Sequence, residues 1–169
     1  RSASNKIWTA VNYSGEIDTK KYKAHYEDGT TFYYKTECKN ASLFPRGWKV
    51  ASTQDYKDMI KVVSENNTYT DPSKRLWMTQ RTDPYCKGRD AYPWDENAGC
   101  PAYLNSVSLF NLKPATKCWE VGKKHVEKES DTKAWFITSD DQYVEFNKDG
   151  SYHFYSAGNY CMPVRLVMD

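Results

Sequence analysis

Long apolar runs and an excess of one charge sign are both missing from this sequence. Hydrophobic residues make up 39% of its 169 positions, and no stretch approaches the roughly 20 consecutive apolar residues of a membrane-spanning helix. The chain carries 24 Lys and Arg against 22 Asp and Glu. This balance gives no electrostatic reason to expect nucleic acid or an anionic membrane surface as a partner. We therefore expect no nucleic-acid partner and no direct membrane insertion of this segment.

Familiar catalytic motifs are missing as well. Histidine occurs only at positions 25, 125 and 153, and none stands in an H-E-x-x-H or C-x-x-C context that would bind zinc. The G-x-S-x-G nucleophile turn and the G-x-x-x-x-G-K-[ST] phosphate loop do not occur. His153 lies in an expected strand, where a surface or half-buried ring is a simpler interpretation than a general base. We expect no catalytic residues and no cofactor.

Two acidic clusters are the nearest approach to a metal site. One is the Trp-Asp-Glu-Asn run at 94–97, and the other combines Asp140 and Asp141 with Asp149. A hard cation such as calcium needs several converging oxygens, and a solvated loop explains each cluster more simply. We expect no required metal.

What the sequence does contain is one domain's length of chain and many aromatic residues. The 169 residues suffice for one sizeable core, so we expect a single domain over 1–169. Aromatic residues make up 15% of the chain, and 14 of them are tyrosine. Such a composition favours β-strands and surfaces that hold ligands by flat, amphipathic contact.

Five cysteines stand at 38, 86, 100, 118 and 161, an odd number with no C-x-x-C pair. Cys86 and Cys100 bracket a run with Gly and Pro, and a disulfide between them would close this loop. The alternative is that the cysteines are buried thiols that act as small hydrophobic residues. Residues 1–4 have neither an initiator Met nor a signal-peptide core. We expect a mature segment located outside the cytoplasm.

One amphipathic helix is predicted at about 53–65. Ser52 is followed three residues later by Asp55, which is a helix-start signature. Apolar residues then recur with helical spacing at Tyr56, Met59, Ile60 and Val63. A second helix near 33–41 is an alternative to the mostly extended conformation that we expect for the first forty residues.

The last third of the sequence predicts antiparallel sheet. Runs 134–139, 142–147 and 151–156 are short, aromatic or β-branched, and separated by turn residues, which is the pattern of a β-meander. In the second run, Val144 and Phe146 alternate with Tyr143 and Glu145, so one face should be core and the other wet. A final strand is expected at 164–167.

Aromatic residues in irregular segments are the candidate ligand-binding residues. Segment 66–105 is punctuated by Pro and Gly and predicts long loops. Tyr85, Tyr92 and Trp94 lie in this segment, and Trp119 lies in a later connection. Exposed rings of this kind can stack on the apolar face of a sugar or anchor a protein contact. The alternative is that the rings form a satellite core beneath the loop.

Four segments of the sequence are similar, in the same order, to four motifs of one known family. Residues 44–56, Phe-Pro-Arg-Gly-Trp-Lys-Val-Ala-Ser-Thr-Gln-Asp-Tyr, align without gaps with C-P-x-G-W-[HR]-[LV]-P-[TS]-x-x-[DE]-[WFY]. Residues 110–115 are similar to G-F-x-x-x-P-[AG], 135–139 to W-W-S-S-T, and 162–167 to [FYL]-[SP]-V-R-x-V. On these segments the chain resembles the Fibrobacter succinogenes major paralogous domain family. The resemblance implies a C-type-lectin-like fold in a bacterial surface or secreted protein.

Two of the departures from this family concern cysteine. Members often carry cysteine where this chain has Phe44 and Leu166, and in the lectin-like fold such a pair would join the helical layer to the last strand. Both residues are apolar here, so we expect a packed contact in place of the covalent link.

The fold that we expect is therefore α+β and C-type-lectin-like. It would contain a mostly antiparallel mixed sheet, one main helix at about 53–65, and long loops. The function expected from the resemblance and the aromatic residues is non-catalytic recognition at the cell exterior, with a glycan or a cell-surface protein as the ligand. A structural or tip subunit of a surface assembly is the alternative, and an enzyme is the third.

Overall fold

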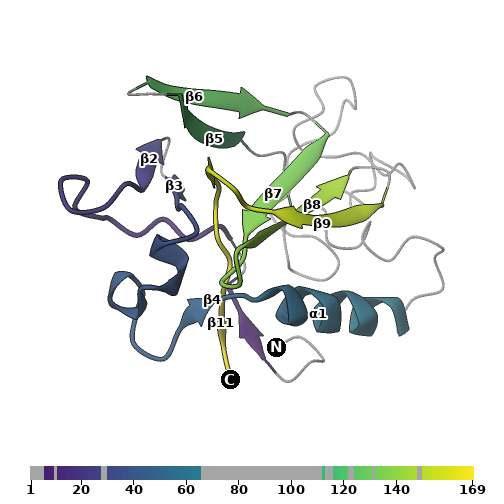
Figure 1. The fold of residues 1–169 in the computed structure, drawn as a ribbon. Coiled ribbons are helices and arrows are strands. Elements are labelled where there is room, and N and C mark those ends of the chain that lie inside the picture. The colour runs from purple at the N-terminus through teal and green to yellow at the C-terminus, as the bar shows by residue number, and fades with distance from the viewer. Residues whose placement is uncertain are drawn as a thin grey trace, which may run out of the picture.

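In the part of the chain that the structure describes, one α-helix is combined with small antiparallel sheets, so the architecture is α+β as expected (Figure 1). The computed structural model describes residues 6–9, 11–27, 30–65, 112, 116–121, 124–130, 132–147 and 150–169. Helix α1 spans Thr53–Glu65, and two short 3₁₀ turns, η1 and η2, span Glu37–Lys39 and Ala41–Leu43. The strands are β1 (Ile7–Trp8), β2 (His25–Glu27), β3 (Thr30–Phe32), β4 (Lys49–Val50), β5 (Thr116–Val121), β6 (Lys124–Glu129), β7 (Lys133–Ile137), β8 (Gln142–Asn147), β9 (Tyr152–Ser156), β10 (Tyr160–Cys161) and β11 (Leu166–Met168).

The sheets join segments that are far apart in the sequence. Strand β11 pairs with both β1 and β4, and strand β5 lies between β10 and β6. Strands β7, β8 and β9 form the third sheet, and β2 and β3 form a hairpin. In Figure 1, the β7–β8–β9 sheet lies between helix α1 below and the β5–β6 hairpin above. This arrangement agrees with the contacts of α1 with β8 and of β5 with β7.

Helix α1 has the bounds that the sequence predicts. The Ser52 hydroxyl accepts the backbone N–H of Asp55 at 3.1 Å, and the Asp55 carboxylate accepts the N–H of Ser52 at 2.9 Å. This is a reciprocal capping box. Asp140, in the turn before β8, also accepts from the backbone N–H and the hydroxyl of Thr53, both at 2.9 Å. The start of the helix is thus tied to the meander.

The structure has no α-helix at 33–41, where the sequence analysis gave a second helix as an alternative. The chain forms strand β3 up to Phe32 and then the two 3₁₀ turns η1 and η2. Tyr33 instead pairs with Met162 in an isolated antiparallel bridge. This long-range pairing holds the backbone extended where a helix would otherwise begin, so tertiary contacts override the local preference.

The predicted meander is confirmed, with β7, β8 and β9 paired in order and antiparallel. The expectation that one face of β8 is wet is wrong, because Tyr143, Val144, Glu145 and Phe146 are all buried. Val144 and Phe146 pack in the same buried cluster as residues of α1. Tyr143 packs in a second cluster on the other face. The β7–β8–β9 sheet is therefore covered on both faces at its centre.

A tight turn at residues 45–48 places Trp48 against the core. The Trp48 N–H donates to the Pro45 carbonyl at 3.0 Å, and Gly47 has a φ of 86°, in the left-handed region that favours glycine. Trp48 then packs against the second buried cluster, which includes Phe44 and Leu166. The contact expected in place of a covalent link between Phe44 and Leu166 is consistent with their shared cluster.

Arg165 is a buried cation that fastens the N-terminal segment to the end of the chain. It is 1% exposed, and its guanidinium donates to Asn12 Oδ1 at 3.0 Å and to the Thr9 carbonyl at 3.1 Å. The same group lies over the Phe136 ring at 5.2 Å. Burial lowers the pKa of Arg165 to about 10, which still leaves it charged at neutral pH. Its role is structural.

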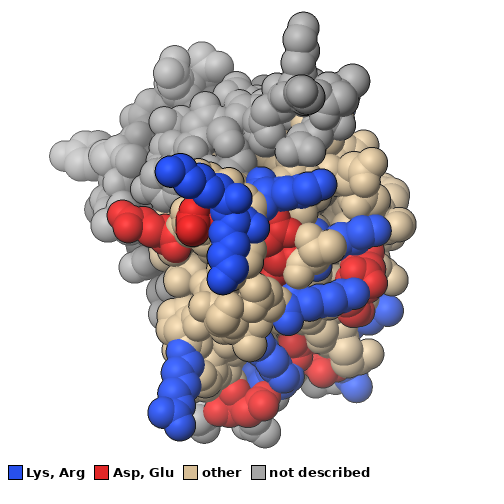
Figure 2. Space-filling model, turned by 60° about the vertical axis from the view of Figure 1, so that its left-hand side comes forward, with Lys and Arg blue, Asp and Glu red and all other residues tan. Residues whose placement is uncertain are grey.

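On the face shown in Figure 2, Lys and Arg side chains are interspersed with Asp and Glu. This mixture agrees with the near balance of 24 basic and 22 acidic residues in the whole sequence. Mixed charge of this kind produces no extended field of one sign.

Candidate ligand-binding surface

Of the residues predicted from the sequence to form sites, the structure describes one, Trp119. The others lie outside the described residues: Tyr85, Tyr92 and Trp94 of the ligand-binding set, and Cys86 and Cys100 of the proposed disulfide. Trp119 lies in strand β5 and not in an irregular connection. It is half-buried, and its surroundings define the candidate surface.

Trp119 begins a row of aromatic side chains that crosses four strands, β5, β10, β8 and β9. Its ring lies 5.8 Å from that of Tyr160, which lies 5.8 Å from Tyr143; Tyr143 lies 5.2 Å from Tyr155, and Tyr155 lies 6.1 Å from His153. All of these are centroid distances, within the range of favourable ring contacts. We call Trp119, Tyr160, Tyr143, Tyr155 and His153 the aromatic row.

Strand register explains why these rings meet. Tyr160 stands opposite Trp119 across β10 and β5, and Tyr155 stands opposite Tyr143 across β9 and β8. Directly opposed side chains in an antiparallel pair lie on the same face of the sheet. Because residues alternate along a strand, His153 shares the face of Tyr155.

Accessibility differs along the aromatic row, being lowest in the middle and highest at the end formed by Tyr155 and His153. Tyr143 in the middle is 7% exposed and supports its neighbours. Trp119 and Tyr160 are half-buried, whereas His153 is exposed and Tyr155 is 43% exposed. The row therefore combines a packed base with ring surface that a ligand can reach.

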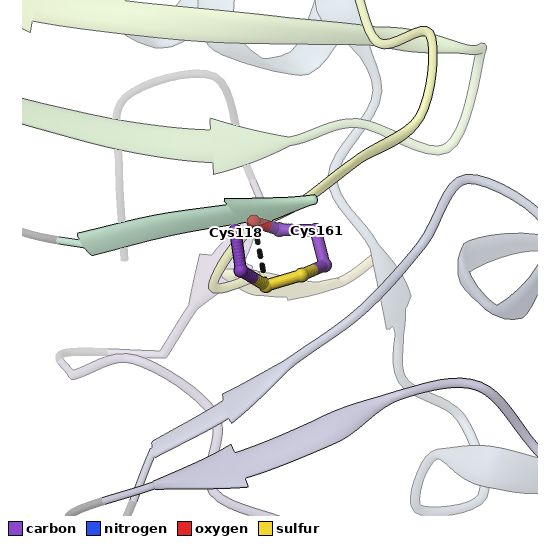
Figure 3. The surroundings of a disulfide bond; sticks show 2 residues. All are labelled: Cys118 and Cys161. Carbon is purple, nitrogen blue, oxygen red and sulfur yellow. Dashed lines mark hydrogen bonds between the residues drawn. A yellow bond between two sulfur atoms is a disulfide. The ribbon is translucent and has the colours of Figure 1, made fainter. Parts of the chain in front are cut away.

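A disulfide lies on the opposite side of β5 from Trp119. Figure 3 shows Cys118 of β5 joined to Cys161 of β10. Both cysteines are buried in a small cluster with Phe32 and Tyr34. Because Cys118 precedes Trp119 and Cys161 follows Tyr160, the bond holds together the two strands that place these rings opposite each other. This pairing was not foreseen from the sequence.

A buried lysine lies beneath the middle of the row. Lys117 is 9% exposed, and its ammonium lies 4.6 Å from the ring centroid of Tyr160, 4.7 Å from that of Trp135 and 5.5 Å from that of Tyr143. Aromatic faces attract cations, most strongly when water is excluded. Burial lowers the pKa of Lys117, and the like charges of Lys128 and Lys133 act in the same direction.

Glu145 is a buried carboxylate whose negative charge acts on Lys117. Trp135 donates its indole N–H to Glu145 Oε1 at 2.9 Å, and Lys133 Nζ lies 3.3 Å from Oε2. Burial opposes ionisation of Glu145, but these two donors and the charge of Lys117 hold its pKa below the ordinary value. Glu145 is thus ionised at neutral pH, and each of its oxygens has a partner.

A second exposed tyrosine lies on the other face of β9. Tyr152 is 38% exposed and stands opposite Phe146, whose side chain packs with helix α1. Phe154 shares this face and lies beneath the ammonium of Lys57 at 5.4 Å. Tyr152 and Phe154 therefore do not belong to the aromatic row.

Sequence reasoning missed four members of the row and Lys117. The alternation in 142–147 did place Tyr143 and Glu145 on one face, but that face was interpreted as wet. No local signal connects Tyr160 or Lys117 to this surface, because both reach it through pairing of strands distant in sequence.

Comparison with protein-family models, curated proteins and solved structures found no match to this chain. Within the described ranges, no group of three or more His, Cys, Asp or Glu is placed to hold a metal ion. None of the helices described is long and apolar enough to cross a membrane.

Proposed function

We propose that this protein is a non-catalytic recognition domain of a bacterial surface or secreted protein, and that it binds a glycan through the aromatic row. The observation that carries the proposal is the continuity of ring contacts from half-buried Trp119 to exposed Tyr155 and His153. Tyr and Trp offer large, rigid contact area at a small cost in side-chain entropy. Such rings stack on the apolar faces of sugars.

Packing of the motif segments supports membership of the Fibrobacter succinogenes major paralogous domain family and a C-type-lectin-like fold. Trp48 from the first motif packs against the cluster that holds Trp135 from the third and Leu166 from the fourth. Leu112 from the second motif is buried in the adjoining cluster with Val167. Segments that resemble one family in sequence thus meet in the core.

The disulfide between Cys118 and Cys161 supports a location at the cell surface or outside the cell. Structural disulfides form and persist in oxidising compartments and are rare in the cytosol. The bond also strengthens the site, because it joins the two strands that carry Trp119 and Tyr160.

Binding of the purified chain to a glycan array, followed by calorimetry with the best ligand, tests the proposal. We expect Tyr155→Ala and Trp119→Ala each to weaken binding by about 5- to 30-fold, which is roughly 1–2 kcal/mol for one aromatic contact. Tyr152→Ala is the matched control, since it removes an exposed tyrosine from the same strand but from the other face. Equal losses in Tyr152→Ala and Tyr155→Ala would contradict the assignment of the site to the row.

A structural subunit of a surface assembly is the second candidate function. It is favoured by the exposure of Tyr152 and Tyr155 on opposite faces of β9, because aromatic residues are enriched in protein interfaces. Sedimentation over a range of concentrations distinguishes the two candidates. Self-association that both tyrosine variants abolish, together with an array on which no glycan is bound, would replace the glycan proposal by this one.

A further inference from the structure

We propose that the glycan recognised by the aromatic row is acidic, and that Lys117 binds a carboxylate of a sugar stacked on the neighbouring rings. The proposal rests on the function proposed above and specifies the chemistry of its ligand. It depends on the unusual position of one ammonium group.

Lys117 is nine-tenths buried, and among the described residues its ammonium lacks the oxygen partners that a buried cation normally has. Its ammonium faces the rings of Tyr160, Trp135 and Tyr143. Among the residues that the structure describes, it makes no hydrogen bond and no ion pair. Ring faces offset part of the cost of burying a charge, but they accept none of the three ammonium N–H groups in the way an oxygen does.

The nearby carboxylate of Glu145 does not fill this role. Its Oε1 accepts from the Trp135 indole and its Oε2 pairs with Lys133. Glu145 attracts Lys117 through space, but its hydrogen-bonding partners are other groups. No described residue thus accepts a hydrogen bond from Lys117, whose donors can serve a ligand.

Two further lysines act on Lys117 with like charge. Lys128 stands opposite Lys117 across β6 and β5 and is exposed. The charges of Lys128 and Lys133 both oppose protonation of Lys117 and lower its pKa, in addition to the effect of burial. Among the side chains that the structure describes around this group, three lysines, Lys117 included, accompany one carboxylate, that of Glu145. A bound anion would neutralise the excess and supply the missing acceptors.

The position of Lys117 relative to the row indicates where on the ligand this charge must lie. Its ammonium is 4.6 Å from the ring centroid of Tyr160, the ring that also contacts Trp119 and Tyr143. A sugar stacked on these rings would hold a substituent of its own ring within reach of the ammonium. A carboxylate attached directly to the sugar ring, as in a uronic acid, has the required charge and short reach.

An array that carries carboxylated, sulfated and neutral oligosaccharides tests this inference with the full chain. We expect carboxylated sugars to be bound, and methyl esterification of the best ligand to weaken binding at least about tenfold, because esterification removes the charge and leaves the stacking faces. Raising the salt concentration should weaken binding of the acid but not of its ester.

Variants test the residue assignment. Lys117→Met should weaken binding of the acid at least about tenfold, whereas Lys117→Arg, which keeps the charge, should lose much less. Lys57→Met is the matched control, because Lys57 lies over Phe154 on the other face of the sheet. Should Lys117→Met fail to fold, Lys128→Met, at an exposed residue, is the second variant. It should weaken binding of the acid and leave binding of its ester unchanged.

Three outcomes would overturn the inference. If binding is confined to neutral glycans and depends on Tyr155, the proposed function stands. The inference that the glycan is acidic is then contradicted. Preference for sulfated over carboxylated sugars would contradict the inference that Lys117 binds a carboxylate. Absence of binding to every glycan would overturn the proposed function itself, and the inference with it.

Discussion

Trp119 stands directly opposite Tyr160 across strands β5 and β10, with ring centroids 5.8 Å apart, and the disulfide Cys118–Cys161 joins the neighbouring pair of residues. Rings on one side of the two strands are thus held in register by a covalent bond on the other. The contact that begins the aromatic row depends on this register. Stability of the domain and geometry of the candidate site are therefore coupled at this point.

Removing the disulfide is expected to lower the stability of the domain and to weaken ligand binding. The bond closes a loop with a sequence separation of 43, so Cys118→Ala combined with Cys161→Ala should lower the free energy of unfolding by about 4 kcal/mol in the chain-entropy description. Urea denaturation measures this loss, and calorimetry should show weaker glycan binding by the folded variant. Cys38→Ala, at a buried free cysteine, is the control and should leave binding unchanged. Unaltered binding without the disulfide would contradict the coupling.

Cys38 is expected to be chemically inert in the native protein. Its side chain is buried at 5% exposure, and burial raises the pKa of the thiol, with the adjacent Glu37 charge acting in the same direction. The reactive thiolate is therefore scarce at neutral pH. Mass mapping after treatment with iodoacetamide should find the Cys38 peptide unmodified in native protein and modified in denaturant. Rapid native modification would contradict this placement.

Stability should fall at acidic pH through the start of helix α1. Burial opposes ionisation of Asp140, but its hydrogen bonds with Thr53 and Thr138 hold its pKa below the ordinary value of 3.8. The folded form therefore binds fewer protons than the unfolded chain near this pH. The contribution is present above about pH 4 and is lost as pH falls through the lower folded pKa.

Thermal unfolding between pH 7 and pH 3 measures this effect. Asp140→Ala should lower stability at pH 7 by about 1 kcal/mol, because Thr53 loses an acceptor at the helix start. The variant should also lose less additional stability on acidification than the unaltered protein. Asp58→Ala, where the carboxylate accepts from the exposed Gln54 side chain, is the control. Parallel pH profiles for the unaltered protein and Asp140→Ala would argue against a contribution from Asp140.

The turn that precedes Trp48 should be sensitive to the residue at position 47. Gly47 has a φ of 86°, so Gly47→Ala should cost roughly 1–2 kcal/mol of stability through backbone strain. Gly47→Asn should cost less, since asparagine tolerates positive φ better. Denaturation in urea compares the variants. Space is not the cause, because an added Cβ would meet only an ordinary contact with Met168 at 3.5 Å.

The parts of the fold that were predicted depend on local patterns. Helix α1 begins at Thr53 because Ser52 and Asp55 form a capping box within four residues, and its apolar spacing then continues to the core. The meander over β7, β8 and β9 was likewise predicted from short alternating runs and turn residues. Such features need only neighbours in the sequence.

Features that depend on distant pairing were not predicted. The 3₁₀ turns that replace a possible helix near 33–41 follow the bridge between Tyr33 and Met162. The burial of Tyr143 and Glu145 follows coverage of the sheet's second face. Among the predicted binding residues, Trp119 does lie on the candidate surface, but in strand β5 and for a reason the sequence did not supply.

By itself, the sequence determined one capped amphipathic helix, an antiparallel meander and a high content of aromatic residues. Only the tertiary structure decided that Cys118 joins Cys161, that Trp119 meets Tyr160, and that Lys117 is buried among rings without a hydrogen-bonding partner in the described part of the chain. The reason is physical. Capping, alternation and turn formation act over a few residues, whereas the face on which a strand residue finds its partners is set by long-range pairing and by the burial that pairing permits.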